Sequence, residues 1–189
     1  MTFERVTWPR QTERLSLRPL ETTDLPAVFG YRSDPEVARW THLAQPFDVV
    51  EAMAYLDVAM ALWREGTGAS FVIVDRADEL LGAVTRFGPD GHGATVGLWL
   101  APRGRGRGIG TRTLRLVLDW TFATTEVVRI DCYIEVGNEA SMRMVERVGF
   151  RREGLLRAWD MGPHGPIDCV VWSVVRSDER WEPVYPTRP

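Results

Sequence analysis

The sequence predicts an α/β fold of the α+β type, in which one mixed β-sheet is flanked by helices. Stretches with apolar residues at helical spacing alternate with short, β-branched apolar stretches, as expected for helices placed between strands. The length of 189 residues suits one domain, and neither a repeat nor a linker divides the chain. We therefore expect a single domain with one core.

The first half of the chain should contribute strands and helices in turn. Thr22 or Thr23 can cap a helix that carries Pro26 in its early turn. Apolar residues recur at helical spacing after residue 47, and Gly66 would end that helix. In chain order, we expect a strand at 15–20, helices at 22–32, just after 34–35 and at 47–64, and strands at 70–75 and 80–87.

The second half should complete the sheet. Turn residues at 89–91 and 162–166, rich in glycine and proline, separate pairs of strand candidates. A helix candidate beginning at Ile109 has one broad apolar face. In chain order, we expect a strand at 95–100, a helix at 109–122, a strand at 127–135, a helix at 139–148, and a hairpin of strands 155–161 and 168–175.

A glycine-rich turn follows the strand expected at 95–100. Residues 103–110 read Arg-Gly-Arg-Gly-Arg-Gly-Ile-Gly, and the helix begins at Ile109. Glycines let backbone N–H groups approach a ligand at a helix N-terminus, which attracts anions, and arginine side chains pair well with phosphates. This pattern predicts a binding site for a pyrophosphate group.

Three other interpretations of this turn fit less well. A P-loop ends in Gly-Lys-Ser/Thr, and the chain has no lysine among its 23 basic residues. The glycine spacing does not match a Rossmann fingerprint, and an RGG-type nucleic-acid segment would not lie between a strand and a helix. The net charge of −3 also argues against nucleic-acid binding.

Other features exclude further kinds of site. Cys132 and Cys169 lie in apolar strand candidates without metal-ligand spacing, so we expect buried reduced thiols and no metal. The sequence has neither a charged leader nor an apolar run of about 20 residues, so we expect a cytoplasmic protein without membrane contact. A second group of arginines is either a solvated helix face or additional support for phosphates: Arg143, Arg147, Arg151 and Arg152.

The glycine turn and a second block together resemble the GNAT acetyltransferase superfamily. The superfamily signature Arg/Gln-x-x-Gly-x-Gly/Ala corresponds to Arg-Gly-Arg-Gly-Ile-Gly at 105–110. The block Asn138-x-x-Ser141, with the sequence that follows it to Gly154, is similar to the RimJ/RimL branch. The resemblance runs from Thr12 to Val174, and we expect the domain at 12–180, with an N-terminal extension at 1–11 and a proline-rich C-terminal tail at 181–189.

This resemblance implies a GNAT-like, mostly antiparallel sheet of six or seven strands in which strands four and five splay apart. It also implies acetyl-CoA as co-substrate, an amine acceptor and a homodimer. Of Trp99 we expect the backbone to bind the cofactor and the side chain to pack. The residues implied in cofactor binding are Leu98, Trp99, Leu100, Arg103, Arg105, Gly106, Arg107, Gly108, Ile109, Gly110, Asn138 and Ser141.

The resemblance further implies Ser141 as the acid that protonates the leaving thiolate. Other GNAT enzymes use a tyrosine four residues later, but Val145 occupies that position and has no proton to give. Taken alone, a serine in the first turn of a helix is more often an N-cap.

The resemblance to the RimL-like branch also implies a general base on the C-terminal hairpin, near the acceptor amine. The strand-four glutamate of several GNAT enzymes falls at Thr95 in this chain, so Asp160 is the replacement that we expect. Asp168 lies across the hairpin and either shares this work or holds the turn. Glu153 and Asp131 remain alternatives for the base.

These expectations define an acetyl-CoA:amine N-acetyltransferase. Its acceptor would be the N-terminal amine of a protein or peptide, or a small amine such as an antibiotic or a peptide natural product. Deprotonating an α-amine at pH 7 costs about 1.1 kcal/mol and a lysine side chain about 4.6 kcal/mol, so a weak base favours the α-amine. The alternative is a non-catalytic acyl-CoA sensor or scaffold with the same fold.

Overall fold

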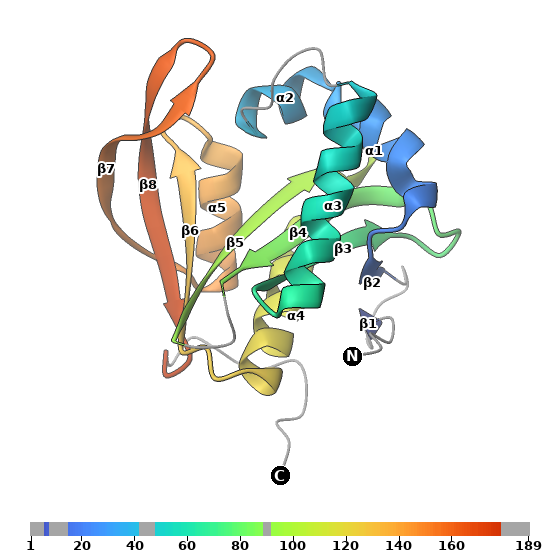
Figure 1. Cartoon of the computed structure of the whole chain (residues 1–189). Helices are drawn as coiled ribbons and strands as arrows, with labels where there is room; N and C mark the ends of the chain where they lie inside the picture. The colour runs from blue at the N-terminus through green and yellow to red at the C-terminus, as the bar shows by residue number, and fades with distance from the viewer. Residues whose placement is uncertain (1–5, 8–14, 42–47, 89–91, 179–189) are drawn as a thin grey trace. The chain divides into compact units, whose positions relative to one another are not determined.

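The computed structural model describes residues 6–7, 15–41, 48–88 and 92–178 (Figure 1). The predicted turn at 89–91 and the predicted tail at 181–189 lie outside these residues. The strands are β1 (Val6–Thr7), β2 (Ser16–Pro19), β3 (Gly68–Val74), β4 (Leu80–Phe87), β5 (Gly93–Leu100), β6 (Arg129–Glu135), β7 (Arg151–Gly162) and β8 (Gly165–Val175). The helices are η1 (Thr22–Asp24), α1 (Leu25–Arg32), α2 (Pro35–Thr41), α3 (Val49–Glu65), η2 (Pro102–Gly104), α4 (Ile109–Thr124) and α5 (Glu139–Val148).

The strands are hydrogen-bonded in the order β1-β2-β3-β4-β5-β6-β8-β7. Strand β2 is antiparallel to β1 and β3, and β8 is antiparallel to β6 and β7, whereas β5 and β6 run parallel. This mixed, mostly antiparallel sheet confirms the predicted fold class. The eighth strand is the short β1, which lies within the expected N-terminal extension.

The parallel ladder between β5 and β6 is short. It joins Gly93 to Arg129, Ala94 to Ile130 and Thr95 to Asp131, although both strands continue beyond these pairs. Within the described residues, the parallel register therefore ends part-way along β5 and β6. In the resemblance to GNAT enzymes, β5 and β6 correspond to strands four and five, which are expected to separate.

The chain forms two compact units. The first unit contains residues 1–85 and 97–110, and the second contains residues 86–96 and 111–189. Strands β4 and β5 each contribute residues to both units. The glycine-rich turn up to Gly110 thus belongs to the first unit, and the Asn138–Ser141 block and the C-terminal hairpin belong to the second.

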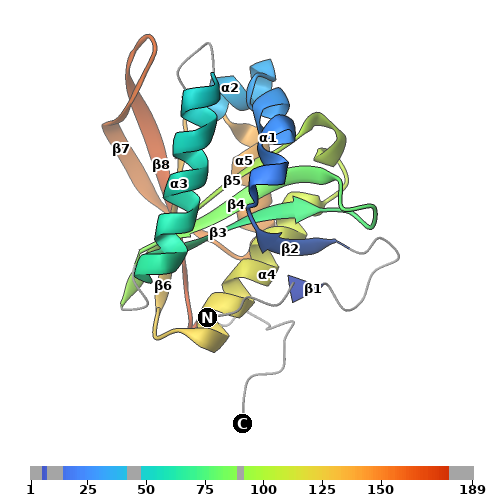
Figure 2. The same cartoon turned by 45° about the vertical axis from the view of Figure 1, so that its right-hand side comes forward.

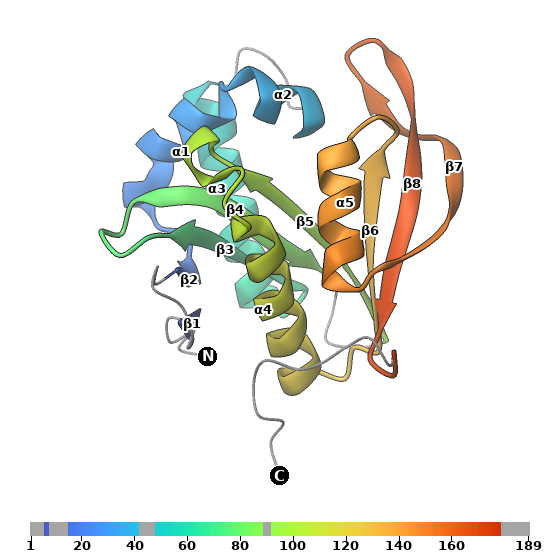
Figure 3. The same cartoon turned by 180° about the vertical axis from the view of Figure 1, so that it is seen from behind.

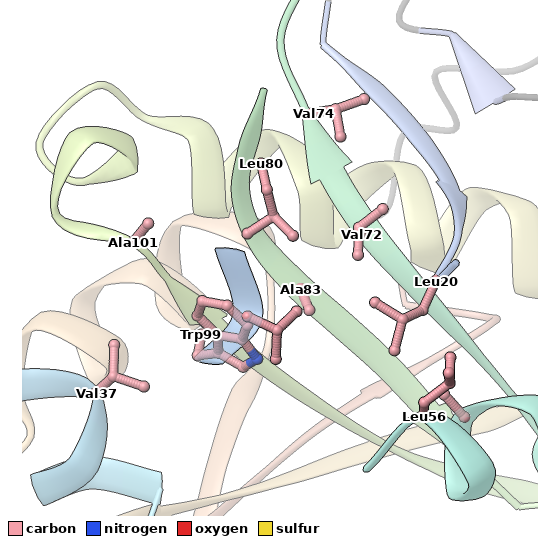
Figure 4. Close-up of a cluster of buried hydrophobic side chains, with 11 residues drawn as sticks. Leu20, Val37, Leu56, Val72, Val74, Leu80, Ala83, Trp99 and Ala101 are labelled. Carbon is pink, nitrogen blue, oxygen red and sulfur yellow. The ribbon is translucent and has the colours of Figure 1, made fainter. Parts of the chain in front are cut away.

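The first unit has a core between its helices and its strands. Helix α1 contacts α3, and α3 packs on β3 (Figure 2). Burying a valine or leucine side chain stabilises a fold by about 1.5–3 kcal/mol, so this cluster supplies much of the unit's stability. Its members are Leu20, Val28, Val37, Leu56, Ala59, Val72, Val74, Leu80, Ala83, Trp99 and Ala101 (Figure 4).

The second unit contains the antiparallel strands β6, β8 and β7, with α5 beside β6 (Figure 3). Along β6, buried Ile130, Cys132 and Ile134 alternate with more exposed residues, as expected for a strand covered on one face. On α5, Val145 and Val148 are buried. The helix therefore presents an apolar stripe.

Local signals in the sequence set the ends of two predicted helices. Asp48 and Glu51 form a capping box at the start of α3, with hydrogen bonds of 3.0 and 3.3 Å. Gly66 ends α3 in the left-handed conformation, at φ 67°, as predicted. At α5, Asn138 is the N-cap and Gly149, at φ 115°, is the C-cap.

The predicted threonine cap of α1 is wrong. Glu21 precedes the turn η1, and the carboxylate of Asp24 accepts the backbone N–H of Glu21 at 2.8 Å. Arg18 of β2 donates two hydrogen bonds of 2.7 Å to Asp24, and both side chains are buried. This buried Arg–Asp pair outweighs the local preference for a threonine cap.

The first strand of the C-terminal hairpin is longer than predicted. Strand β7 begins at Arg151, because Arg151 pairs with Ser173 of β8. The register shifts between Leu156 and Asp160, where β7 carries more residues than the facing stretch of β8. Such a bulge bends a strand and redirects its side chains.

Candidate functional site

The turn between β5 and α4 is packed tightly against β4. Ala101 donates its backbone N–H to the carbonyl of Leu81 at 2.9 Å, and Gly104 donates to Ala101 at 2.8 Å. A Cβ on Gly104 would lie 2.7 Å from the Leu81 carbonyl oxygen, which is closer than carbon and oxygen can approach. Gly104 is therefore required for packing.

The following glycines serve the backbone conformation. Gly106 and Gly108 have φ angles of 72° and 70°, in the left-handed region that glycine adopts readily. Both are exposed, and a Cβ on Gly106 would meet nothing within 4 Å. The exposed segment leads into Ile109, the first residue of a helix of 16 residues, whose N-terminus carries partial positive charge. This arrangement suits an anion.

Two of the three arginines in the turn are held by carboxylates of the first unit. Arg103 forms ion pairs with Asp75, at 3.3 Å, and with Glu79. Arg105 donates to Asp34 at 2.6 Å. These guanidinium groups support the turn from within the protein, so the backbone N–H groups are the better candidates for contact with phosphate.

Arg107 is the third arginine of the turn. Its side chain is exposed, and its Nη1 donates to the carbonyl of Arg103 at 3.5 Å.

Of the predicted cofactor residues on β5, Trp99 is buried in the core cluster, which confirms that its side chain packs. Leu98 and Leu100 are half-buried neighbours on the same strand.

In the second unit, Asn138 and Ser141 are joined by a hydrogen bond. The Oδ1 atom of Asn138 accepts the backbone N–H of Ser141 at 3.1 Å, so Asn138 caps α5. Ser141 is therefore not the N-cap residue. Its hydroxyl is a half-buried group in the first turn of the helix.

Asp168 of the hairpin lies near this helix start. The carbonyl of Asp168 accepts the backbone N–H of Val136 at 3.0 Å, two residues before Asn138. The carboxylate of Asp168 accepts the N–H of Ala158 at 2.8 Å across the bulge. Asp160 is exposed, and its Oδ1 accepts the N–H of the next residue at 2.8 Å.

Cys169 carries a buried thiol on the same hairpin. Burial raises the pKa of its thiol, and the negative charges of Asp160, Glu135 and Asp168 raise it further. Three carboxylates therefore act on the charge of this one buried thiol. Both cysteines are free and buried, as predicted.

The two alternative bases are engaged by Arg129. Its guanidinium donates to both carboxylate oxygens of Glu153, at 2.9 and 2.6 Å, and lies 2.7 Å from Asp131. Ser173 also donates to Glu153. The hydrogen bonds from Arg129 and Ser173 lower the pKa of Glu153 to about 2, so this carboxylate holds a proton poorly at neutral pH.

An aromatic pair, which the sequence reasoning missed, lies beside the bulge. The rings of Tyr133 and Trp159 stack with centroids 4.7 Å apart and an interplanar angle of 26°. Half of the surface of Trp159, 51%, is exposed. The sequence shows only that a tryptophan precedes the predicted base, since the pairing with Tyr133 depends on the bulge.

Comparisons with known proteins place these features in a family. The acetyltransferase (GNAT) domain profile matches residues 14–151, which is well over half of the chain. The chain belongs to the GNAT acetyltransferase family. This match includes the glycine turn and the Asn138–Ser141 block, the two features that carry the resemblance in the sequence.

Individual relatives agree with this assignment. The GNAT chain is 28% identical over 170 residues to the uncharacterized N-acetyltransferase p20 of Bacillus licheniformis, covering 88% of this chain and 96% of p20. Mycobacterium smegmatis RimJ, solved in complex with CoA-disulfide, has 25% identity and a TM-score of 0.78, covering 86% and 82% of the two chains. Vibrio cholerae spermidine N-acetyltransferase, solved with CoA and spermine, has 21% identity and a TM-score of 0.75, covering 86% and 96%.

Other kinds of site gain no support in this GNAT domain. Across the described ranges, no group of three or more histidine, cysteine or acidic side chains is arranged to hold a metal ion. None of the described helices combines the length and the apolar character needed to cross a membrane. In the second arginine group, Arg143 lies 3.9 Å from Glu139 and Arg151 lies 3.0 Å from Asp178, which favours a solvated surface.

Proposed function

We propose that this GNAT enzyme transfers an acetyl group from acetyl-CoA to a primary amine by direct attack in a ternary complex. The observation that carries the proposal is the turn between β5 and α4, where Gly106 and Gly108 adopt left-handed conformations at the start of a long helix. We assign residues 12–180 to the catalytic domain, which includes the matched region at 14–151.

The cofactor is assigned to two groups of residues. The exposed backbone from Gly106 to Gly108 and the first turn of α4 would bind the pyrophosphate. The edge of β5 at Leu98, Trp99 and Leu100 would pair with pantetheine amides, because a strand edge offers backbone donors and acceptors. Asn138 and Ser141 would contact the thioester end.

The chemistry requires a neutral amine and a proton for the leaving group. The amine nitrogen forms a bond to the acetyl carbon, and the carbon–sulfur bond breaks. We assign the removal of the amine proton to Asp160, directly or through a water molecule. We assign protonation of the leaving sulfur to the hydroxyl of Ser141, which is half-buried and remains available because Asn138 supplies the cap of α5.

The assignment of the base to Asp160 rests on the condition of the other carboxylates. Arg129 holds Glu153 and Asp131, and Asp168 holds the backbone of Ala158. Asp160 accepts the backbone N–H of its neighbour Met161 and is exposed on the hairpin. Amines are stronger bases than carboxylates, which favours an acceptor amine of low pKa.

We therefore propose an N-terminal α-amine of a protein or peptide as the acceptor, with a small-molecule amine as the other candidate. The likeness to Mycobacterium smegmatis RimJ, at 25% identity and a TM-score of 0.78, supports this choice, since the Asn138–Ser141 block also resembles the RimJ/RimL branch. The stacked Tyr133 and Trp159 would give an acceptor chain an apolar surface beside Asp160. Small amines include antibiotics and peptide natural products.

The test is acetyl transfer to a panel of peptides with different N-terminal residues, and to polyamines and aminoglycosides, measured by thiol release and product mass. The proposal predicts amine-dependent release of CoA, with peptides better than polyamines, and a large loss in Ser141→Ala. Binding of acetyl-CoA without transfer to any amine, and unchanged in Ser141→Ala and Asp160→Asn, would instead support a non-catalytic acyl-CoA sensor.

A further inference from the structure

The ion pair between Arg105 and Asp34 joins the glycine turn to helix α2. The Nη2 atom of Arg105 lies 2.6 Å from Oδ1 of Asp34, and their side chains are 35% and 20% exposed. The same oxygen accepts the backbone N–H of Val37 at 3.1 Å, in the first turn of α2. One carboxylate oxygen thus bonds both the arginine of the turn and the start of the helix.

Arg105 is also bonded to the end of β5. Its Nε donates to the carbonyl of Leu100 at 3.1 Å, and its backbone N–H donates to Pro102 at 3.2 Å. The planar, charged guanidinium can bond a carbonyl and a carboxylate at once in a fixed geometry. Lysine lacks the planar fork of donors, and glutamine lacks the charge. Arg105 therefore spans the distance from the strand end to α2.

The charge state of Asp34 suits this role. Burial raises the pKa of this carboxyl, but the hydrogen bonds from Arg105 and from the N–H of Val37 lower it more, and its pKa lies below the usual value. The carboxylate therefore stays ionised near neutral pH. The ion pair is present under the conditions in which an amine would be acetylated.

Helix α2 depends on a few attachments of this kind. It has seven residues, and a helix of this length is unstable on its own in water. Val37 is its one buried residue, in the cluster that contains Trp99 of β5 (Figure 4). The helix is thus attached through Val37 at the core and through Asp34 at Arg105.

The segment after Arg105 begins with a glycine, the residue with the fewest conformational restrictions. Gly106 adopts φ 72°, is exposed, and has open space where a side chain would be. A glycine backbone of this kind samples many conformations unless a ligand holds it. An anion bound to the N–H groups of this segment would order the residue next to Gly106, which is Arg105.

We propose that Arg105 is a positioning residue that couples cofactor binding to the ordering of α2. Acetyl-CoA orders the glycine turn by binding the backbone N–H groups of the turn. The ordered turn fixes Arg105, and the ion pair of Arg105 with Asp34 then holds the first turn of α2 in place. Ordering of one segment by a ligand at another is a recognised form of coupling between sites. The inference rests on the proposed binding of acetyl-CoA at the glycine turn, and it assigns Arg105 no direct contact with phosphate.

The test is amide hydrogen exchange of residues 36–41 with and without acetyl-CoA, in the full chain. In the unaltered protein, saturating acetyl-CoA should slow exchange of this segment at least about threefold. Asp34→Ser keeps a good N-cap but is too short to reach Arg105, and Arg105→Gln removes the charge. In each variant the slowing caused by acetyl-CoA should disappear while binding persists.

A double-mutant cycle separates positioning from phosphate contact. If Arg105 acts through Asp34, the two single variants and the double variant should lose the same protection of α2, and their acetyl-CoA dissociation constants should stay within about threefold of each other. If Arg105 binds phosphate, Arg105→Gln should weaken acetyl-CoA at least about tenfold more than Asp34→Ser. That result would overturn the proposal.

Glu36→Gln is the matched control, because it removes one negative charge from the first turn of α2. This variant should retain the protection of α2 from amide exchange that acetyl-CoA causes. If Glu36→Gln loses this protection, the effect comes from the charge of the helix, and the role of Arg105 is overturned. The coupling is also overturned if acetyl-CoA still protects α2 in Asp34→Ser. It is overturned as well if the unaltered protein shows no protection of α2 although calorimetry detects binding of acetyl-CoA. Absence of any acetyl-CoA binding would instead refute the proposed function. Circular dichroism establishes that each variant is folded, and Arg105→Lys repeats the test with the positive charge kept.

Discussion

The carboxylate of Asp168 accepts a hydrogen bond of 2.8 Å from the backbone N–H of Ala158. Ala158 has a φ of 51°, in a region that costs a residue with a side chain about 1–2 kcal/mol. Asp168 thereby holds the bulge of β7, beside which Asp160 and Trp159 lie. This contact gives Asp168 a structural role and distinguishes it from Asp160.

The first prediction compares these two aspartates. Asp160→Asn should lower kcat by about 10²-fold or more and change its pH profile, as expected for loss of a general base. Asp168→Asn should instead lower the free energy of unfolding, by about 0.5–1 kcal/mol, because a charged acceptor is replaced by a neutral one. Steady-state kinetics across pH and urea unfolding measure the two effects. An unchanged kcat and pH profile in Asp160→Asn would remove it as the base.

The second prediction concerns Ser141. Ser141→Ala should slow acetyl transfer by about 10²-fold while leaving acetyl-CoA affinity nearly intact, because the variant lacks only the proton donor. The backbone N–H that bonds Asn138 remains, so α5 keeps its cap. Ser33→Ala, at an exposed serine after α1, is the matched control and should leave kcat unchanged. Equal rates for the two variants would refute the role of Ser141.

The third prediction separates two glycines of the same turn. Gly104→Ala should destabilise the whole fold, because its Cβ would meet the Leu81 carbonyl at 2.7 Å. Gly106→Ala meets no atom, so its cost is the strained φ of 72°, about 1–2 kcal/mol. We expect it to weaken acetyl-CoA about tenfold with a smaller effect on melting temperature. The opposite order of effects would contradict the geometry of the turn.

The fourth prediction follows from the lowered pKa of Glu153. Because its pKa is about 2 in the folded chain, below the usual 4.5, its contacts stabilise the fold above about pH 4.5 and lose this effect as the pH falls toward 2. Glu153→Gln should therefore be less stable than the unaltered protein at pH 7, and this difference should shrink at pH 2.5. Denaturant midpoints at both pH values measure it.

The same variant tests the choice of base. Since Arg129 keeps Glu153 ionised, Glu153→Gln should leave the pH profile of kcat unchanged between about pH 6 and 9. A shift of that profile comparable to the one expected in Asp160→Asn would assign the base to Glu153 instead.

The fifth prediction concerns the acceptor. Trp159→Ala should raise the KM for a peptide acceptor by about five- to tenfold, because the variant removes half of the stacked surface beside Asp160, while kcat falls less. Trp159→Phe should restore most of the affinity. Equal KM values in all three proteins would exclude this surface from acceptor binding.

Much of the fold could be predicted from local sequence signals. The helix ending at Gly66 and the helix at 139–148 appear as predicted, because a glycine C-cap and strong apolar spacing define them locally. The cap of α1 was predicted wrongly, since the buried pair of Arg18 and Asp24 depends on a strand that packs there only in the folded chain. The bulge in β7 depends likewise on its register with β8.

The candidate site was predictable in its residue types but not in its contacts. The glycines of the turn identify the anion site through backbone conformation, which sequence reveals. The partners of Arg103 and Arg105 are carboxylates far away in the chain, so no local pattern predicted that these arginines pair within the protein. The same holds for Arg129 and Glu153.

The most direct test of the account is a calorimetric titration of the purified protein with acetyl-CoA, beside dephospho-CoA and a control oligonucleotide. We predict micromolar binding of acetyl-CoA, weakened in Gly106→Ala, and no binding of the oligonucleotide. A folded sample that does not bind acetyl-CoA would contradict the assignment of the glycine turn and the enzyme function built on it.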